Sequence, residues 1–364
     1  MGKKVILCTL VALLVFSGTA FAGGGRQQDD GRFVGIAMPT RSSQRWIQDG
    51  DNLRAQLEAH GFRVDLQYGE DIVENQVAQI ENMITRGVNF LIIASIDGEA
   101  LVPVLARARA AGIPVIAYDR LIRNSPYVSY YVSFDNFAVG QQMGEILIRG
   151  LDLDAATVAN PRYIEVFGGS PDDNNAFFFY NGAMDILNPF IDRGVLRIGS
   201  GQRGMAQVGT LRWAGELAQA RMDNLLSAHY TARRLDGVLS PYDGISLGII
   251  SSLRGAGFGT PGNPMPIVGG QDAILPSVRA MIDGYQYATI FKDTRLLAAA
   301  AVEMIVSLYE GRPATVNNTT DYHNGVIIVP SYLLPSEIVF RENIRQVLVD
   351  SGYYTFAEIG RGTF

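Results

Sequence analysis

From residue 33 onward, short runs of apolar residues recur along the chain, separated by stretches with a helical pattern. The runs do not alternate strictly between apolar and polar residues, which is typical of strands covered on both faces of a parallel sheet. They span residues 33–38, 90–94, 114–118, 163–167, 195–198, 235–239, 266–268 and 287–291. Between them, apolar residues recur at helical spacing and end at a glycine, as in Val77, Ile80 and Ile84 before Gly87. This alternation of strand and helix predicts right-handed crossover units and an α/β fold.

Residues 1–22 follow a different pattern, which is that of a cleaved secretory signal peptide. A basic start at Lys3 and Lys4 precedes an apolar stretch, and an A-x-A cleavage site ends at Ala22. The apolar stretch is too short for a membrane span, which needs roughly 20 residues. Cleavage after Ala22 removes Cys8, the one cysteine, and takes the formal charge from −6 to −8. We therefore expect an exported protein that resides in the periplasm.

The composition narrows the classes of protein that fit. With 364 residues, 48% of them hydrophobic, the chain has enough apolar side chains for one very large domain or for two lobes. A formal charge of −6 argues against nucleic acid as a partner, because duplex binding needs a concentrated basic face. Three histidines and one cysteine leave too few ligands for a zinc site, and we expect no metal and no cofactor.

Polar and charged side chains gather at the carboxyl ends of the predicted strands, where doubly wound sheets bind their ligands. These strand ends carry Asp119, Arg120, Asp173, Asn175, Tyr242, Asp272 and Lys292. A sugar needs this mixture of acceptors and donors for its hydroxyls, and it needs aromatic rings such as Trp46 for its apolar faces. Because the pattern recurs at several strand ends, the sequence predicts a cleft for a polar small molecule.

Two motifs match enzyme or cofactor signatures but lack the context that these signatures require. Residues 199–204 match the dinucleotide fingerprint G-x-G-x-x-G, but no helix opens at once. Asp223, at about the right distance for a ribose partner, falls inside a helical stretch instead of at a strand end. Residues 244–248 match the hydrolase elbow G-x-S-x-G, but Ser246 falls inside a predicted helix, away from the sharp turn that the elbow needs. We interpret both as incidental matches.

Several longer segments resemble the periplasmic aldose-binding proteins of ABC importers. They cover residues 45–46, 117–124, 168–175, 270–273 and 291–293. Further segments at 177–184 and 240–244 resemble the ChvE-like, multiple-sugar-binding branch of that family, with the xylose-binding proteins next. One departure is Arg203, which stands where the xylose-binding proteins carry a tryptophan. Arg203 either lines a wider and more polar pocket or points into solvent, so the preferred sugar stays open.

The resemblance implies a type I periplasmic-binding-protein fold, in which two doubly wound parallel-sheet lobes are joined by three crossover strands. We expect an N-terminal lobe of residues 33–130 plus 293–328 and a C-terminal lobe of residues 131–292 plus 329–364. We expect the crossovers near residues 127–133, 291–293 and 328–331. In the family, the residues matching Arg45, Asp119 and Arg120 contact the sugar from the N-terminal lobe, and those matching Asp173, Asn175, Asp272 and Lys292 contact it from the other lobe or the hinge. Trp46 and Tyr242 supply aromatic faces.

We therefore expect a non-enzymatic receptor that captures a monosaccharide by hinge closure and delivers it to the permease of an ABC transporter. The expected ligand is an aldopyranose such as glucose, galactose, xylose or arabinose. A chemoreceptor or the periplasmic domain of a sensor kinase is a further candidate partner, and we expect a monomer. The alternative from another class is an exported sugar-processing enzyme on the same α/β frame. Lys292 is one of only three lysines, and we expect its compact ammonium to contact one sugar oxygen.

Overall fold

Six parallel strands form the first sheet of the computed structural model, which describes residues 31–360. In sheet order they are β11 (Ser331–Leu334), β5 (Tyr130–Phe134), β4 (Val115–Tyr118), β3 (Phe90–Ile93), β1 (Phe33–Met38) and β2 (Arg63–Tyr68). Side chains along β1 alternate between two apolar clusters, with Val34 and Ile36 in one and Phe33 and Ala37 in the other. The sheet is therefore covered on both faces, as predicted. The predicted signal peptide lies outside the described residues.

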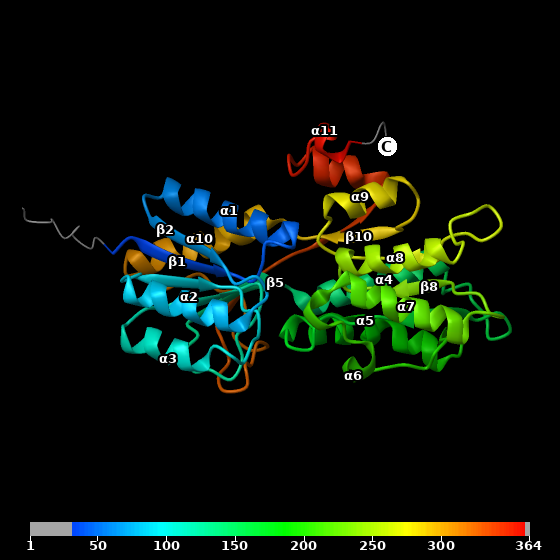
Figure 1. The fold of residues 1–364 in the computed structure, drawn as a ribbon, viewed down its shortest axis with the longest axis horizontal. Helices are drawn as coiled ribbons and strands as arrows, with labels where there is room; N and C mark the ends of the chain where they lie inside the picture. The colour runs from blue at the N-terminus through cyan, green and yellow to red at the C-terminus, as the bar shows by residue number, and fades with distance from the viewer. Residues whose placement is uncertain (1–30, 361–364) are drawn as a thin grey trace, which may run out of the picture. The chain divides into compact units, whose positions relative to one another are not determined.

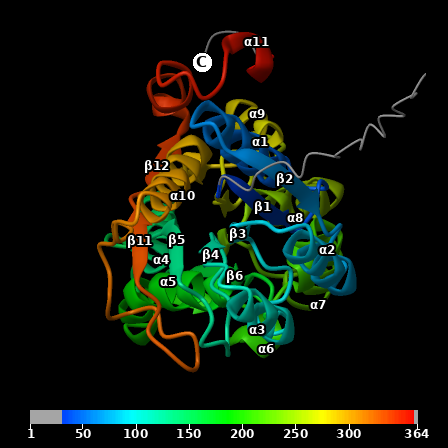
Figure 2. The same cartoon turned by 90° about the vertical axis from the view of Figure 1, so that its left-hand side faces the viewer.

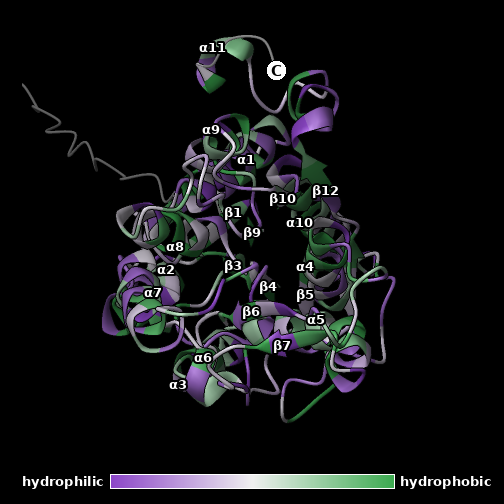
Figure 3. Ribbon diagram, turned by 90° about the vertical axis from the view of Figure 1, so that its right-hand side faces the viewer, coloured by the Kyte–Doolittle hydropathy of each residue, from purple (hydrophilic) through white to green (hydrophobic). Residues whose placement is uncertain are grey.

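Two pairs of helices cover this sheet (Figure 1). α1 (Gln44–Ala59) packs against α10 (Thr294–Tyr309), and their buried leucines belong to the same cluster as Val34. α2 (Val73–Thr85) packs against α3 (Val102–Ala110), and their buried residues belong to the cluster of Phe33. α10 is coloured largely as hydrophobic in Figure 3, because it is buried between α1 and the sheet.

Four parallel strands form the second sheet, in the order β7 (Leu196–Ile198), β6 (Arg162–Val166), β8 (Gly237–Leu239) and β9 (Ile267–Val268). α4 (Asn136–Leu151) and α5 (Asn174–Asp192) pack together on one face. α7 (Gly215–His229) and α8 (Asp243–Gly255) pack together on the other face. The short helix α6 (Met205–Val208) lies between β7 and α7 in the chain.

A third, two-stranded element adds one antiparallel pair to the parallel sheets. β10 (Ala288–Phe291) pairs antiparallel with β12 (Glu337–Phe340). On its other side β10 continues the second sheet, because residues 268–272 run parallel to it through backbone hydrogen bonds. α9 (Leu275–Ile282) packs against β10, and α11 (Phe356–Ile359) packs against α9. The predicted parallel-sheet lobes are confirmed, and the antiparallel pairing of β10 with β12 is an addition that the sequence did not reveal, because an apolar run does not encode the direction of its strand.

We call the first sheet with α1, α2, α3 and α10 the N-terminal lobe, and the second sheet with α4, α5, α7, α8 and the β10–β12 pair the C-terminal lobe. Figure 2 shows β11 beside β5 in the first sheet, although the predicted boundary at residue 328 assigns β11 to the other lobe. The exact lobe boundaries stay a prediction. Among residues 31–360, no helix is both long enough and apolar enough to cross a membrane.

Candidate binding site

A cavity of about 420 Å³ lies between loops of the two lobes. This volume falls within the range of roughly 300–1,000 Å³ that small-molecule sites occupy. All nine residues predicted for the site line it: Arg45, Trp46, Asp119, Arg120, Asp173, Asn175, Tyr242, Asp272 and Lys292. Their arrangement follows from the parallel sheets, since the carboxyl ends of the strands in each lobe open onto the same space. Their role in binding stays a prediction.

Arg45 joins carboxylates of both lobes. Its Nη1 lies 3.0 Å from Oδ1 of Asp272 in the C-terminal lobe, and its Nη2 donates to Oδ1 of Asp119 in its own lobe. Its Nε donates to Asp49, one turn further along α1, at 3.2 Å. Burial lowers the pKa of Arg45, but the three carboxylates more than offset this and hold the pKa well above its usual value. Arg45 therefore stays charged although it is buried.

Asp272 lies between two cations. Lys292 Nζ is 2.9 Å from the same Oδ1 that Arg45 contacts. Burial raises the pKa of Asp272, but Arg45 and Lys292 together lower it by a larger amount. The resulting pKa is therefore below the ordinary value. The backbone of Asp272 has a φ of 92°, a positive value that residues other than glycine rarely adopt. Asp272 is therefore a fixed, ionised acceptor.

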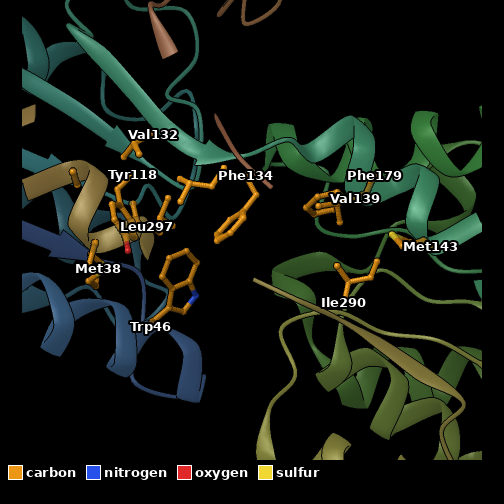
Figure 4. Packing of buried hydrophobic residues seen from close by; sticks show 14 of the residues in the cluster. Met38, Trp46, Tyr118, Val132, Phe134, Val139, Met143, Phe179, Ile290 and Leu297 are labelled. Carbon is orange, nitrogen blue, oxygen red and sulfur yellow. The ribbon is translucent and has the colours of Figure 1, made fainter. Parts of the chain in front are cut away.

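Lys292 follows β10 and is only 3% exposed. Its ammonium lies 5.8 Å from the centre of the Phe134 ring and 5.5 Å from that of Phe179, within the range of cation–π attraction. Figure 4 shows Trp46 extending from α1 toward Phe134, so aromatic rings surround this part of the cavity. Lys292 is therefore not an exposed surface lysine but part of the cavity wall.

Arg120 and Asp173 form the second charged pair across the lobes, with Nε 3.0 Å from Oδ2. Arg120 also donates from Nη1 to the Ser95 carbonyl oxygen at 3.0 Å. Asp173 caps the start of α5 by accepting from the Asn175 backbone at 3.0 Å. Burial raises the pKa of Asp173, and the attraction of Arg120 offsets only part of this effect. Asn175 donates from Nδ2 to the Asp119 carbonyl oxygen at 2.9 Å, so the two strand ends are tied directly.

Tyr242 and Trp213 complete the aromatic lining. The Tyr242 hydroxyl lies 3.1 Å from Ser43 Oγ of the other lobe, and burial raises the pKa of Tyr242 to about 12. Trp213, which the sequence did not place in the site, packs edge-on against both Tyr242 and Phe179. Its segment lies between α6 and α7, away from any strand end, so the strand-end pattern gave no signal for it.

Other lining residues also escaped the sequence pattern, among them Asp71, Arg212 and Glu216. Arg203 is exposed and is not among the residues that line the cavity. Of the two interpretations of Arg203, solvent exposure is therefore the one that the structure favours.

Three buried polar atoms of the lining have no hydrogen-bond partner within residues 31–360. They are Arg120 Nε, Trp213 Nε1 and Gln271 Oε1. Arg120 Nε lies 3.0 Å from Asp173 Oδ2, but the direction of its N–H bond does not meet the angle that a hydrogen bond requires. Two donors and one acceptor on lining residues therefore lack a partner in this part of the chain, and a ligand with hydroxyl groups suits such a set because a hydroxyl both donates and accepts.

The two motifs interpreted as incidental carry structural roles. Ser246 lies in α8, and its hydroxyl donates to the Gly269 carbonyl oxygen at 2.7 Å. Ser200 donates to Glu165 at 2.7 Å. Neither serine lines the cavity. Within residues 31–360, no group of histidine, cysteine or acidic side chains is arranged to hold a metal ion.

The fold and the cavity define a periplasmic binding protein of type I, with the ligand site between two α/β lobes. Residues 34–313 match the periplasmic binding protein domain family, and the chain belongs to that family. It is 54% identical to the multiple sugar-binding periplasmic receptor ChvE of Rhizobium radiobacter, over 97% of this chain and 98% of the relative. It is 57% identical to the multiple sugar-binding periplasmic protein SbpA of Azospirillum brasilense, over 89% and 90% of the two chains.

A solved structure supports the same fold. An ABC transporter solute-binding protein from Clostridium phytofermentans with bound β-D-glucose superimposes with a TM-score of 0.86 at 47% identity. The match covers 90% of this chain and 99% of the other. The expected type I fold and the expected multiple-sugar-binding branch are both confirmed.

Proposed function

We propose that this protein is a periplasmic receptor that captures one monosaccharide and delivers it to the permease of an ABC transporter. The observation that carries the proposal is the convergence of buried carboxylates, cations and aromatic rings from both lobes on one cavity of about 420 Å³. The relatives ChvE and SbpA are multiple sugar-binding proteins, and the Clostridium protein holds β-D-glucose. These similarities support an aldopyranose as the ligand.

The charges of the cavity support a neutral ligand. Its lining contains four cationic side chains, Arg45, Arg120, Arg212 and Lys292, and five acidic ones, Asp71, Asp119, Asp173, Glu216 and Asp272. The deepest of them already form ion pairs with one another. A polyol forms charge-assisted hydrogen bonds to such pairs without adding a net charge to a buried site. A charged ligand adds a net charge to the buried cavity, and the free-energy cost of its desolvation weakens its binding.

Hinge closure is the proposed mode of capture. The chain passes between the lobes after β5, between β10 and α10, and between β11 and β12. We place the three hinge passages there, at residues 134–136, 291–294 and 334–337, which refines the predicted crossovers by a few residues. Ligand contacts from both lobes form only in the closed state, so the sugar shifts the population toward that state.

The remaining expectations belong to the same proposal. Cleavage after Ala22 releases the mature chain into the periplasm as a monomer. The closed, loaded form is the one that a permease reads, and a chemoreceptor or the periplasmic domain of a sensor kinase is a further partner of that form. The relatives ChvE and SbpA are a receptor and a binding protein, which supports a role without catalysis.

A panel of sugars tests the proposal and separates it from an exported sugar-processing enzyme. Calorimetric titration with glucose, galactose, xylose and arabinose measures the affinity for each, and glucuronic acid tests the preference for a neutral ligand. We expect saturable binding of one sugar per chain and recovery of the sugar unchanged after incubation. Turnover of a bound sugar identifies the enzyme instead, and absence of binding to all four aldoses contradicts the proposal.

A further inference from the structure

Residues 210–214, which we call the Trp213 segment, carry backbone strain beside the cavity. They connect α6 to α7, and they bring Trp213 into the cavity wall. Arg212 and Trp213 both have left-handed backbones, with φ of 54° and 56°. Side chains with a Cβ disfavour this region, so two consecutive left-handed residues persist only where surrounding contacts hold them. The contacts of the segment therefore determine where the Trp213 indole lies.

Most of these contacts lie within the C-terminal lobe. The Arg212 backbone donates to Ser170 Oγ at 2.8 Å, and Arg212 Nη1 lies 2.8 Å from Asp172 Oδ2. The indole of Trp213 lies directly against the backbone of Gly169, where a Cβ would collide with the ring. The loop that follows β6 thus supports the Trp213 segment, and we call this loop the seat of the segment.

Another contact of Arg212 crosses to the N-terminal lobe. Its Nη1 donates to the carbonyl oxygen of Ile96, in the loop after β3, at 3.1 Å. Two residues further along that loop, Gly98 donates to the Asp172 carbonyl oxygen at 3.3 Å. Both bonds join the loop after β3 to the seat of the Trp213 segment. They exist only while the two lobes are together.

We propose that Arg212 is a positioning residue that couples closure of the lobes to the placement of the Trp213 indole against the sugar. The inference rests on the proposed function. In the closed state Arg212 is held from both lobes, and its strained neighbour Trp213 stays in the cavity wall, with its buried Nε1 lacking a hydrogen-bond partner among residues 31–360. On opening, Arg212 loses Ile96, the strained segment loses one of its restraints, and Trp213 is released. Arg212 thereby sets how long the sugar stays bound.

The test compares Arg212→Met with a matched control, Arg123→Ala. Arg212 is 33% exposed and pairs with Asp172, while Arg123 is 31% exposed and pairs with Glu99 within the N-terminal lobe, next to the same loop. Stopped-flow fluorescence gives the association and dissociation rates of D-glucose. Because the contact forms after encounter, we expect Arg212→Met to raise the dissociation rate about tenfold, with the association rate within about twofold of wild type. We expect the control to leave both rates unchanged.

Two further readouts separate positioning from general stability. In protein labelled with 5-fluorotryptophan, fluorine NMR reports the two tryptophans, assigned with Trp46→Phe. We expect the Trp213 signal of the loaded protein to shift or broaden in Arg212→Met, while the Trp46 signal stays in place. Arg212→Lys keeps one cationic nitrogen, and since Nη1 alone makes both contacts we expect it to restore most of the wild-type dissociation rate.

An unchanged dissociation rate in both Arg212 variants, or an unchanged Trp213 signal, overturns this inference while leaving the proposed function intact. A lower melting temperature without a change in the rates also overturns it, because that is the result of a purely structural role. Wild-type protein that binds none of the four aldoses overturns the proposed function and this inference together.

Discussion

Asp272 is in contact with cationic side chains from both lobes. One of its oxygens contacts Arg45 from α1 and Lys292 from the end of β10, and all three side chains are buried. Removal of this carboxylate leaves two buried cations without their shared partner. Such a loss is more costly than the loss of a single neutral hydrogen bond, because a buried charge cannot be resolvated.

We therefore expect Asp272→Ala to weaken sugar binding by at least about 2 kcal/mol, or roughly 30-fold in the dissociation constant. The matched control is Asp236→Ala, directly before β8, because Asp236 accepts a hydrogen bond from the Tyr163 backbone at 2.8 Å and does not line the cavity. The control is expected to cost about 1 kcal/mol of folding stability and no affinity. Calorimetric titration with the tightest aldose measures both. Nearly unchanged affinity in a well-folded Asp272→Ala protein removes the residue from the site.

Asp243 differs from Asp272, because its carboxyl is buried without a cation in contact. It accepts hydrogen bonds from Gln286 at 2.9 Å, from Thr289 at 2.8 Å and from the Ile274 backbone at 3.0 Å. Burial raises its pKa from 3.8 to about 7. A carboxyl whose pKa is raised in the folded state contributes stability that is fully present below the unfolded pKa and is lost as the pH rises through the folded pKa.

The free energy of unfolding should thus fall between about pH 4 and about pH 7 in the wild type, and the fall should be smaller in Asp243→Asn, which cannot ionise. Urea titrations at several pH values measure this difference. Asp154→Asn, at an exposed position, serves as the control and should follow the wild-type curve. Parallel curves for wild type and Asp243→Asn contradict the prediction.

The site could be predicted from single residues to a large extent. All nine predicted side chains line one cavity. The carboxyl ends of parallel strands lie at the same edge of a sheet, regardless of the conformation of the loops between them. Asp71, Arg212 and Trp213 were missed because they reach the cavity from irregular segments, where no periodic pattern marks their direction. Their positions depend on tertiary contacts such as the seat of Trp213 on Gly169.

At the scale of elements, eight strands within residues 31–360 coincide with the predicted apolar runs, whereas β2, β5, β11 and β12 do not. β1 and β3 are apolar throughout, whereas β2 alternates with Arg63, Asp65 and Gln67 at the edge of its sheet. An edge strand has one side next to solvent and carries no continuous apolar run. β12 also lacks a continuous apolar run, and it pairs antiparallel with β10. The apolar pattern of the preceding strands did not indicate this pairing.

Close helix packing is a second feature of the elements that depends on particular residues. Gly248 of α8 faces the first turn of α7, where an added Cβ would collide with the Gly215 carbonyl oxygen. Gly255, in the same helix, has no heavy atom within 4 Å of an added Cβ. The two glycines therefore differ in packing although both belong to α8.

We expect Gly248→Ala to cost about 1–3 kcal/mol of stability, because the clash is with backbone that cannot move aside. Gly255→Ala should be neutral or stabilising by up to about 1 kcal/mol, since alanine favours a helix. Chemical denaturation measures both. Gly248→Ala should also weaken sugar binding, because Gly215 follows Trp213 and Ala214 in the cavity wall. Equal stabilities of the two variants contradict the packing argument.

At the scale of the molecule, two buried ion pairs bridge the lobes, Arg45 with Asp272 and Arg120 with Asp173. Desolvation offsets most of the attraction within a buried pair, so these pairs alone hold the lobes together only weakly. Under the proposed function, bonds from a sugar to the same groups favour the closed arrangement of the lobes over the open one.

Small-angle scattering should accordingly give a smaller radius of gyration with saturating sugar than without it. The control is a sugar that the calorimetric panel identifies as a non-binder, which should leave the curve unchanged. Curves that superimpose with and without a tightly bound aldose contradict closure and indicate a preformed cleft.

The antiparallel return of β12 to β10 has a consequence for how the receptor is made. The strand that precedes Lys292 lacks its antiparallel neighbour until residue 340 has been synthesised, and the first sheet lacks its edge strand until Leu334. Both lobes are therefore completed only by the last tenth of the polypeptide. If the chain is exported as proposed, a chain still in transit has two incomplete sheets. Under that proposal, closure of the lobes around a ligand follows the arrival of residue 340.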